Sequence, residues 1–527
     1  MNDMNWLWCD HLETVRKEAI PEVSLDHWRQ WTLELASGKC RLLSLTALAP
    51  PAGGAPTHLL AIVGRDTTGQ LGLLKTPAVQ AYESLTTHCP QAHLFERELF
   101  ESWGIEPLGH PWLKPVRYPM TRHDGASNPE RRPAGVIDPY QVHGEQVHEV
   151  AVGPVHAGVI EPGHFRFQCH GEKVFHLEIA LGYQHRGIER RLHTLNQALR
   201  AHQIETIAGD TSVGHMTAYC HAVEALSAAA RSESGPLAGG PLAGPASGLA
   251  PSSVPIRAHV IRALALELER SANHVGDLGA LAADVGFLPT QAYCGRLRGD
   301  YLNLTSLVCG NRFGRGLVVP GGTAWDLDIE LAQRLRTRLV EIFADVKGAV
   351  ELMFETPSVR ARFEGTGIVG KEDAKALGLV GVAARASGRA RDARWDHPSG
   401  AWRLLKGAAS VRTSGDVLAR AMVRWMELKH SHEWMLGWLD NLPEGPVCIP
   451  CGPLAADSLV VSLLEGWRGE ILHLLHTDAE GNLAGVKVVD PSFHNWSALA
   501  MALRGGEISD FPLCNKSFNL SYCGFDM

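Results

Sequence analysis

Residues 256–274, IRAHVIRALALELERSANH, determine the character of the larger part of this chain. Apolar residues recur there every three or four positions, which is the spacing of one face of an α-helix. These apolar residues are Ile256, Val260, Ile261, Leu264 and Leu268. The same spacing returns at residues 331–343, and charged residues near position 267 interrupt the first apolar face. The stretch therefore predicts a large, mainly helical domain.

Short apolar runs outside these helices predict strands. Residues 42–48 and 59–64 are separated by a Pro- and Gly-rich segment, which favours a hairpin with a loose turn. Residues 165–167 and 174–179 predict two further strands before the helices begin. Between the two strand regions, residues 92–103 predict a helix.

These elements predict an α+β fold with two domains. We expect a small N-terminal α/β domain at residues 1–117, a polar linker at 118–149, and a large helical domain at 150–527 with a strand-rich opening region. Residues 232–253 are dense in Gly, Pro, Ala and Ser, and we interpret them as a mobile insertion.

Composition excludes several classes of protein. Of the 527 residues 45% are apolar, enough to bury a core, and the formal net charge of −8 argues against a nucleic-acid binder. No apolar run is long enough to span a bilayer, and the N-terminus lacks a signal-peptide pattern. The 11 cysteines are odd in number and scattered, which argues against a disulfide framework. We expect a cytoplasmic protein.

Three blocks carry a family resemblance. The first is FERELFESWGI at 95–105 with GHPWL at 109–113, and the second runs from GPVH at 153–156 through EPGHF at 161–165 to LGYQHRGIE at 181–189. The third is scattered: ELER at 267–270, GNRFGR at 310–315, ARASG at 384–388, EGWRGE at 465–470 and DPS at 490–492.

The first block resembles the end of the 30 kDa-type subunit of respiratory complex I. The second and third resemble its 49 kDa-type subunit and the large subunit of group 4 membrane-bound [NiFe] hydrogenases of the formate hydrogenlyase and hydrogenase-4 types. The chain is thus similar to fused 30 kDa and 49 kDa subunits, and the resemblance implies a subunit of an NADH-quinone oxidoreductase-like or hydrogenase-like complex.

The resemblance also implies four cysteines that hold a nickel-iron pair, and these are missing. The matching positions are Ala208, Thr211, Ser492 and Asn495. None can supply the thiolate that this soft metal pair needs. We therefore expect no nickel-iron centre, no hydrogen activation and no cofactor held by this chain.

The quinone-binding residues that the resemblance implies are only partly retained. His156 matches a histidine that lines the quinone cavity in relatives, whereas residues 207–211 replace the stretch that carries the quinone-binding tyrosine. The polar residues expected at or near the cavity are His156, Asp210, Thr211, His215, Arg394, Ser492, His494 and Asn495. They either bind a small polar ligand and move protons or form a satisfied hydrogen-bond network where a cofactor was lost.

Other charged groups have two interpretations each. His185 and Glu189 are four residues apart, so on a helix they share a face, and Glu189 serves either a proton route or an ion pair with Arg190 or a facing subunit. The loop arginines Arg385, Arg391 and Arg394 either act on the cavity or pair with Asp392 or Asp396. Cys448 and Cys451 are a weak metal or redox signal and favour an ordinary turn with free thiols.

The leading functional hypothesis is a subunit of a membrane-associated, energy-converting oxidoreductase. It takes electrons from an iron-sulfur small subunit, passes them to a quinone or another small acceptor, and docks on integral membrane subunits at the inner face of the cell membrane, where ions are moved. The alternative is a non-catalytic scaffold that kept the large-subunit shape. An active [NiFe] hydrogenase is the least favoured of the three.

Overall fold

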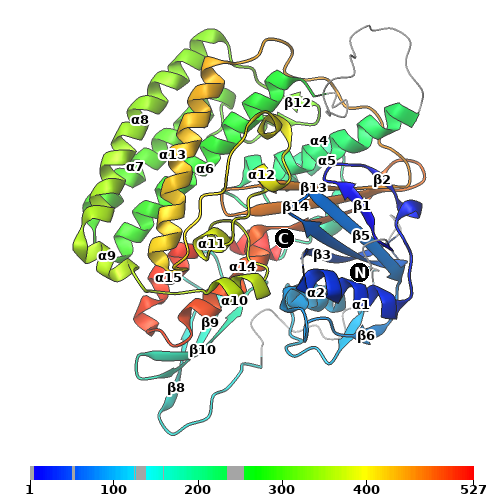
Figure 1. The fold of residues 1–527 in the computed structure, drawn as a ribbon, viewed down its shortest axis with the longest axis horizontal. Coiled ribbons are helices and arrows are strands. Elements are labelled where there is room, and N and C mark those ends of the chain that lie inside the picture. Colours follow the sequence, from blue (N-terminus) through cyan, green and yellow to red (C-terminus); the bar gives the residue numbers. More distant parts are fainter. Residues whose placement is uncertain are drawn as a thin grey trace.

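The N-terminal part of the chain is built around a four-stranded antiparallel sheet (Figure 1). The structure is a computed structural model that describes residues 5–38, 40–49, 54–123, 125, 138–157, 160–233 and 254–527. The strand order is β1-β5-β4-β3. The strands are β1 (Leu7–Asp10), β3 (Arg41–Leu48), β4 (His58–Arg65) and β5 (Gln70–Pro77). Strands β3 and β4 confirm the predicted hairpin.

Two helices and a short parallel strand pair complete this part. Helix α1 (Leu25–Ser37) begins at Ser24, whose hydroxyl accepts the N–H of His27, and it contacts β3, β4 and β5. Helix α2 (His93–Trp103) confirms the helix predicted at 92–103 and ends at Gly104, which has a left-handed conformation. Strand β6 (Ala81–Glu83) pairs in parallel with β7 (Glu106–Leu108).

A second four-stranded sheet joins the two ends of the sequence. Its order is β15-β14-β13-β2, formed by β2 (Val15–Arg16), β13 (Ser458–Glu465), β14 (Glu470–Thr477) and β15 (Leu483–Val489). The N-terminal strand β2 thus adds to a sheet made from C-terminal residues. The predicted boundaries at 117 and 150 stay a prediction, because the buried residues of both parts form one hydrophobic cluster.

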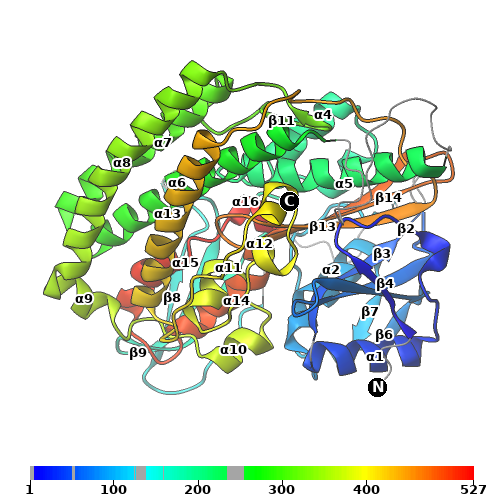
Figure 2. The ribbon, with the colours of Figure 1, turned by 45° about the horizontal axis from the view of Figure 1, so that its top comes forward.

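Four long helices pack together on the side of the molecule away from the N-terminal sheet (Figures 1 and 2). They are α6 (Ile256–Asp284), α7 (Leu288–Cys309), α8 (Ile329–Glu355) and α13 (Val417–Asp440). Helices α6 and α8 confirm the predictions made from apolar spacing. Helix α5 (Ser212–Glu233) lies against β13 and β14 and connects the bundle to the second sheet. Residues 232 and 233 end α5, and the rest of the predicted insertion, residues 234–253, lies outside the described residues.

The opening region contains a third antiparallel sheet with the order β10-β9-β8. It consists of β8 (Val147–Val152), β9 (His164–His170) and β10 (Lys173–Ala180), which confirms both predicted strands. Helix α14 (Pro491–Leu503) lies against β10 and is followed by α15 (Phe511–Phe518) and α16 (Tyr522–Asp526). Residue 124 and residues 126–137 of the predicted linker lie outside the described residues.

The remaining elements are short. They are η2 (Lys17–Ala19), η3 (Pro90–Ala92), α3 (Ile188–Leu192), α4 (Gln197–Glu205), β11 (Val318–Val319), β12 (Gly322–Thr323), α9 (Pro357–Phe363), α10 (Lys371–Ala376), α11 (Gly381–Ala386), α12 (Ala393–Asp396), η4 (Gly400–Leu404) and η5 (Ile508–Asp510). The whole is an α+β fold, as predicted. Within the described residues, no helix is both long and apolar enough to cross a membrane.

The prediction that His185 and Glu189 share a helical face is wrong. Helix α3 begins only at Ile188, because Gly187 before it has a left-handed conformation with φ 64°. His185 lies in the preceding turn, and its Nδ1 is 2.7 Å from the carbonyl oxygen of Asp526.

Candidate functional site

An ion pair lies at the start of α5, where the loop from α4 meets the turn between β13 and β14. Asp210 accepts hydrogen bonds from Nη1 and Nη2 of Arg468 at 2.6 and 2.8 Å. Thr211 donates to Asp210 at 3.1 Å, and its Oγ1 accepts the indole N–H of Trp467 at 3.1 Å. Burial opposes ionisation of Asp210, but the Arg468 guanidinium holds its pKa below the usual value. The Asp210 side chain keeps 31% of its surface exposed, so this carboxylate is the solvent-facing member of the group.

A second carboxyl group lies beside this pair, and its pKa is shifted in the opposite direction. Glu269 on α6 accepts the N–H groups of Val213 and Gly214 in the first turn of α5, at 2.8 and 3.1 Å. Burial nevertheless raises its pKa to about 8, and the charge of Asp210 acts in the same direction. Near neutral pH the site therefore combines an ionised and a protonated carboxyl, an arrangement found where an enzyme separates acid and base roles.

A buried chain of two histidines and an aspartate continues from α5 into the second sheet. Nε2 of His215 is 3.1 Å from Asp490 Oδ2, and its Nδ1 is 3.1 Å from Nε2 of His473 on β14. Because an ionised Asp490 only accepts, His215 donates from Nε2, and a neutral His215 then accepts from His473. Nδ1 of His473 is buried and has no partner among the described residues. This series of hydrogen bonds therefore ends on a free proton acceptor.

The four positions matched to the missing cysteines lie around these groups. Ala208 and Thr211 flank Asp210, and the hydroxyl oxygen of Ser492 accepts the N–H of Ser521 at 2.9 Å. Asn495 exchanges two hydrogen bonds of 3.1 Å with the backbone of Val380. All four residues are buried.

Three other predicted residues lie apart from the Asp210–His215 group. His156, in the loop after β8, has Nε2 2.9 Å from the carbonyl oxygen of Gly163. His494 packs edge-on against Phe95 on α2, and burial lowers its pKa to about 4. Arg394 forms a bidentate ion pair with Asp392, with bonds of 2.9 and 2.6 Å. The pairing with Asp392 that was one interpretation of Arg394 is thus present.

Glu189 takes part in an ion pair, but with a different partner from those expected. It accepts hydrogen bonds from Nζ of Lys487 at 3.0 Å and from the N–H of Val488 at 2.8 Å. Arg190 instead donates to the hydroxyl of Thr121. Glu189 therefore fastens α3 to β15.

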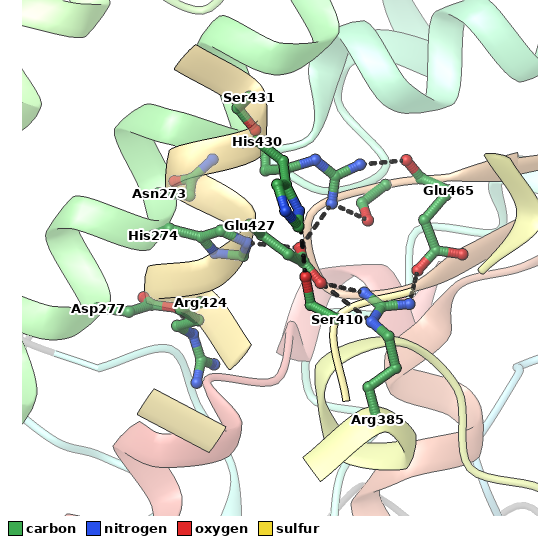
Figure 3. A network of polar contacts seen from close by, with 12 residues as sticks. Asn273, His274, Asp277, Arg385, Ser410, Arg424, Glu427, His430, Ser431 and Glu465 are labelled. Carbon is green, nitrogen blue, oxygen red and sulfur yellow. Dashed lines mark hydrogen bonds and ion pairs between the residues drawn. The ribbon is translucent and has the colours of Figure 1, made fainter. Parts of the chain in front are cut away.

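A buried network of charges supports the turn that carries Arg468 (Figure 3). Glu427 on α13 lies at its centre and accepts from Arg270 at 3.2 Å, from Arg385 at 3.0 Å and from His274 at 2.9 Å. Arg385 also donates to Glu465 at 2.6 Å. Arg270 reaches the backbone oxygens of Glu465 and Gly466 at 2.7 and 3.1 Å. The network thereby fixes the end of β13 directly before Trp467 and Arg468.

The network contains more carboxylates than guanidinium groups. The carboxylates of Glu267, Glu427, Glu465 and Asp392 face Arg270, Arg385 and Arg394. Burial raises the pKa of Glu465 to about 7, with the charge of Asp392 adding to the effect, although Arg385 opposes it. Burial thus favours the protonated form of one carboxyl in the cluster.

Several of these residues were missed as site residues by sequence reasoning. Arg468 and Glu465 lie inside the quoted segment EGWRGE, and Asp490 opens the quoted segment DPS, two residues before the predicted Ser492. These quoted motifs were a usable signal. His473 had none, because it occupies an ordinary position of a buried strand.

Two family models match the chain. The description "Respiratory-chain NADH dehydrogenase, 30 Kd subunit" matches residues 55–132, and "Respiratory-chain NADH dehydrogenase, 49 Kd subunit" matches residues 284–455. Among curated proteins, the carbon monoxide-induced hydrogenase of Rhodospirillum rubrum is 30% identical over 372 residues, covering 70% of this chain and 96% of that protein. The chain belongs to the same family as this hydrogenase, and its residues 284–455 match the 49 Kd subunit model.

Of two further relatives, one is named as a subunit of formate hydrogenlyase and the other as a subunit of NADH-quinone oxidoreductase. Formate hydrogenlyase subunit 5 of Escherichia coli (strain K12) is 29% identical over 458 residues, covering 84% of this chain and 76% of that protein. The C/D protein of NADH-quinone oxidoreductase from Bacteroides thetaiotaomicron is 27% identical over 413 residues, 72% of each chain. This family member is a subunit of an oxidoreductase complex, and it carries the 30 Kd-type and 49 Kd-type parts in one polypeptide, as the resemblance implied.

The residues at the four cysteine positions of this family member do not fit a nickel-iron centre. The side chains of Ala208, Thr211, Ser492 and Asn495 include no sulfur, and the polar ones already bind backbone or neighbouring side chains. In the described part of the chain, no three His, Cys, Asp or Glu side chains are grouped to hold a metal ion. Residues 208–215 and 490–495 lie outside both matched ranges, so this site rests on its geometry.

Proposed function

We propose that the chain is the acceptor-side subunit of a membrane-associated, complex I-like oxidoreductase, and that a small acceptor is reduced beside Asp210. The observation that carries this proposal is the juxtaposition of Asp210, paired with Arg468, with buried Glu269, whose pKa is raised, and the His215–Asp490 pair. These groups can deliver protons to an acceptor that receives electrons from elsewhere. The proposed electron source is an iron-sulfur small subunit, and integral membrane subunits would hold the assembly at the inner face of the membrane and move ions.

A quinone is the proposed acceptor. Its reduction to a quinol takes two electrons and two protons, so a site with proton donors in a largely buried setting suits it. Glu269 can supply one of these protons, and the neutral His215–His473 pair can relay the other, because its free ring nitrogen accepts a proton before one is passed on. The partly exposed Asp210–Arg468 pair gives the oxygen atoms of the acceptor a charged contact. We propose that this chain binds no metal cofactor of its own and does not activate hydrogen, because no thiolate is present at the four matched positions.

The scaffold alternative also has support. The oxygen atoms of Thr211, Ser492 and Asn495 are all hydrogen-bonded, as expected of a finished polar core. The two alternatives predict different rates of acceptor reduction when the site is altered and the complex stays assembled.

The test uses the complex purified from native membranes with Asp210→Asn or Glu269→Gln in this chain. The acceptor role predicts a fall of at least about tenfold in the rate of reduction of a water-soluble quinone, while subunit composition and iron and sulfide content stay unchanged. Asp300→Asn is the control, because Asp300 pairs with exposed Arg296 at 2.9 Å on the helical bundle. Unchanged quinone reduction in both site variants would favour the scaffold.

Metal analysis tests the cofactor proposal separately. Iron and sulfide with less than one nickel per complex are expected. Stoichiometric nickel that stays with this chain after the subunits are separated would contradict the assignment of the four matched positions.

A further inference from the structure

A cavity apart from the Asp210–His215 group is formed by both parts of the chain. It has a volume of about 370 Å³ and is lined by residues of α2, β10 and α14, which lie in the lower half of Figure 1. This volume is within the range of small-molecule sites. Its wall is mostly apolar and includes an aliphatic part, with Leu94, Val116, Leu177, Ile179, Leu181 and Leu377 among the lining residues.

One cation on this wall has no carboxylate partner. Arg97 donates from Nε to the carbonyl oxygen of Lys114 at 2.7 Å and from Nη2 to that of Pro115 at 2.8 Å. Within the described residues it forms no ion pair and no hydrogen bond from Nη1. Burial lowers the pKa of Arg97 to about 10, in contrast to Arg468, whose partner Asp210 raises its pKa. Arg97 still carries its charge at neutral pH.

No other ionisable group of the wall forms an ion pair with Arg97 within the described residues, and the carboxylates of Glu101 and Glu178 act on it only through their charge. Lys114 forms an ion pair with Glu178 at 2.7 Å, so these two charges cancel. Burial lowers the pKa of His93 to about 3 and also lowers those of His110 and His176, so the three rings are neutral at neutral pH. The lining therefore has one net positive charge.

A neutral ring nitrogen in the same wall also lacks a partner. Nε2 of His176 is buried and has no hydrogen-bond partner among the described residues. A buried polar atom in this state costs free energy, which a ligand with a polar head can recover. The cavity thus combines an apolar body with an unpaired cation and an unpaired ring nitrogen.

We propose that this cavity binds a monoanionic amphiphile, an aliphatic carboxylate whose head group contacts Arg97 and whose chain lies along the aliphatic wall. The site is separate from the Asp210–His215 group, and the proposal does not depend on the proposed function. Charge-assisted hydrogen bonds between a guanidinium and a carboxylate are strong and directional, so the head group determines orientation. The aliphatic lining contributes affinity through burial of the chain.

The test is calorimetric titration of the purified full-length chain with decanoate and with decanol. Decanoate is expected to bind with a stoichiometry of one and at least about tenfold more tightly than decanol, since only the carboxylate can pair with Arg97. Arg97→Gln is expected to weaken decanoate binding at least about tenfold and to leave decanol binding unchanged. Arg29→Gln is the matched control, because Arg29 pairs with Glu83 away from the cavity.

Filling the cavity tests the aliphatic part. Ala500→Phe on α14 and Ala180→Phe at the end of β10 both add bulk to the wall and are expected to abolish binding of either probe. Circular dichroism identifies a variant that has lost its fold, and the other variant then decides. Equal affinity for decanol and decanoate, full decanoate affinity in Arg97→Gln, or no binding by the unaltered chain would each overturn the proposal.

Discussion

Glu269 is the residue whose protonation is most displaced by the fold at the candidate site. Burial raises its pKa from 4.5 to about 8 even though two backbone N–H groups donate to it. The folded chain therefore binds a proton at Glu269 that the unfolded chain has released above about pH 4.5. The free energy of unfolding should fall as pH rises from about 4.5 to about 8, through this group.

We predict that Glu269→Gln flattens this dependence. Glutamine resembles the protonated acid, so the variant should lose less stability than the unaltered chain between pH 6 and 9, by about 1–3 kcal/mol. Urea denaturation at several pH values measures the effect. Glu341→Gln on the exposed face of α8 is the control, and an identical pH profile for Glu269→Gln and the unaltered chain would contradict a raised pKa at Glu269.

For single residues, sequence reasoning predicted part of the candidate site. Asp210, Thr211 and His215 were expected together, since they lie within six residues, and the structure brings them together. Their partners Arg468 and His473 come from a strand and turn about 260 residues away, as the Asp210–Arg468 separation of 258 shows. No local pattern reports such pairing. His494 packs against Phe95 on α2, and the charge of Asp490 acts on its ring, so its place in the cavity stays a prediction.

Among the elements, helix α14 begins at Asp490, which both caps the helix and binds His215. Asp490 accepts the N–H of Ser492 at 2.7 Å through Oδ1 and holds His215 through Oδ2. We predict that Asp490→Ala lowers the free energy of unfolding by about 2–4 kcal/mol, because it removes the cap and leaves a buried imidazole N–H unpaired. Asp328→Ala removes the exposed cap of α8 and should lower the free energy of unfolding by about 1 kcal/mol.

Thermal or urea denaturation of the two variants gives this comparison. Equal losses in Asp490→Ala and Asp328→Ala would mean that the contact between Asp490 and His215 adds nothing to folding.

The turn between β13 and β14 requires a glycine on the element that faces it. Gly381 begins α11 with φ 63°, and a Cβ atom there would lie 2.0 Å from the carbonyl oxygen of Arg468. We predict that Gly381→Ala lowers the free energy of unfolding by at least about 3 kcal/mol, because backbone must move. Gly310→Ala is the control. Gly310 has φ 74° with open space around it, so this substitution should lower the free energy of unfolding by only about 1 kcal/mol.

The measurement is equilibrium denaturation followed by circular dichroism. Tolerance of Gly381→Ala at the level of Gly310→Ala would show that the Arg468 turn is free to shift, and the site with it.

Long elements with a strong period were predictable, whereas short ones were not. Helices α6 and α8 and strands β3, β4, β9 and β10 followed from apolar spacing. Strand β2 has only two residues and no period, so its pairing with β13 could not be predicted. His185 was wrongly placed on a helix, because spacing alone ignores the left-handed glycine at 187.

For the whole molecule, a buried ion cluster joins the N-terminal sheet to the large part. Arg41 on β3 donates to Glu470 on β14 at 2.6 Å and to Asp66 at 3.0 Å. Asp66 also pairs with Arg391 at 2.8 Å. The sequence predicted two domains, but it could not predict this contact, which links residues more than 400 positions apart.

We predict that Arg41→Met alone lowers the free energy of unfolding by about 3–5 kcal/mol, since it leaves Glu470 as an unpaired buried charge. Glu470→Met alone should lower it by less, because Arg41 keeps its pairing with Asp66. The double variant should lose less than the sum of the two single losses. Urea denaturation with the exposed pair Arg336–Asp440 as control tests this, because that pair should contribute less than about 1 kcal/mol. Additive losses at Arg41 and Glu470 would contradict the coupling.

The pairing of β2 with β13 affects the order in which the chain can fold during synthesis. Backbone hydrogen bonds of 2.9 Å from Leu12 to Val461 and from Lys17 to Asp457 join a segment to one that is synthesised about 440 residues later. At about 5–20 residues per second, the N-terminal segment waits roughly 20–90 s for its partner strand. During that interval β2 has no partner strand and is open to chaperones, and the second sheet can close only after β13 has been made.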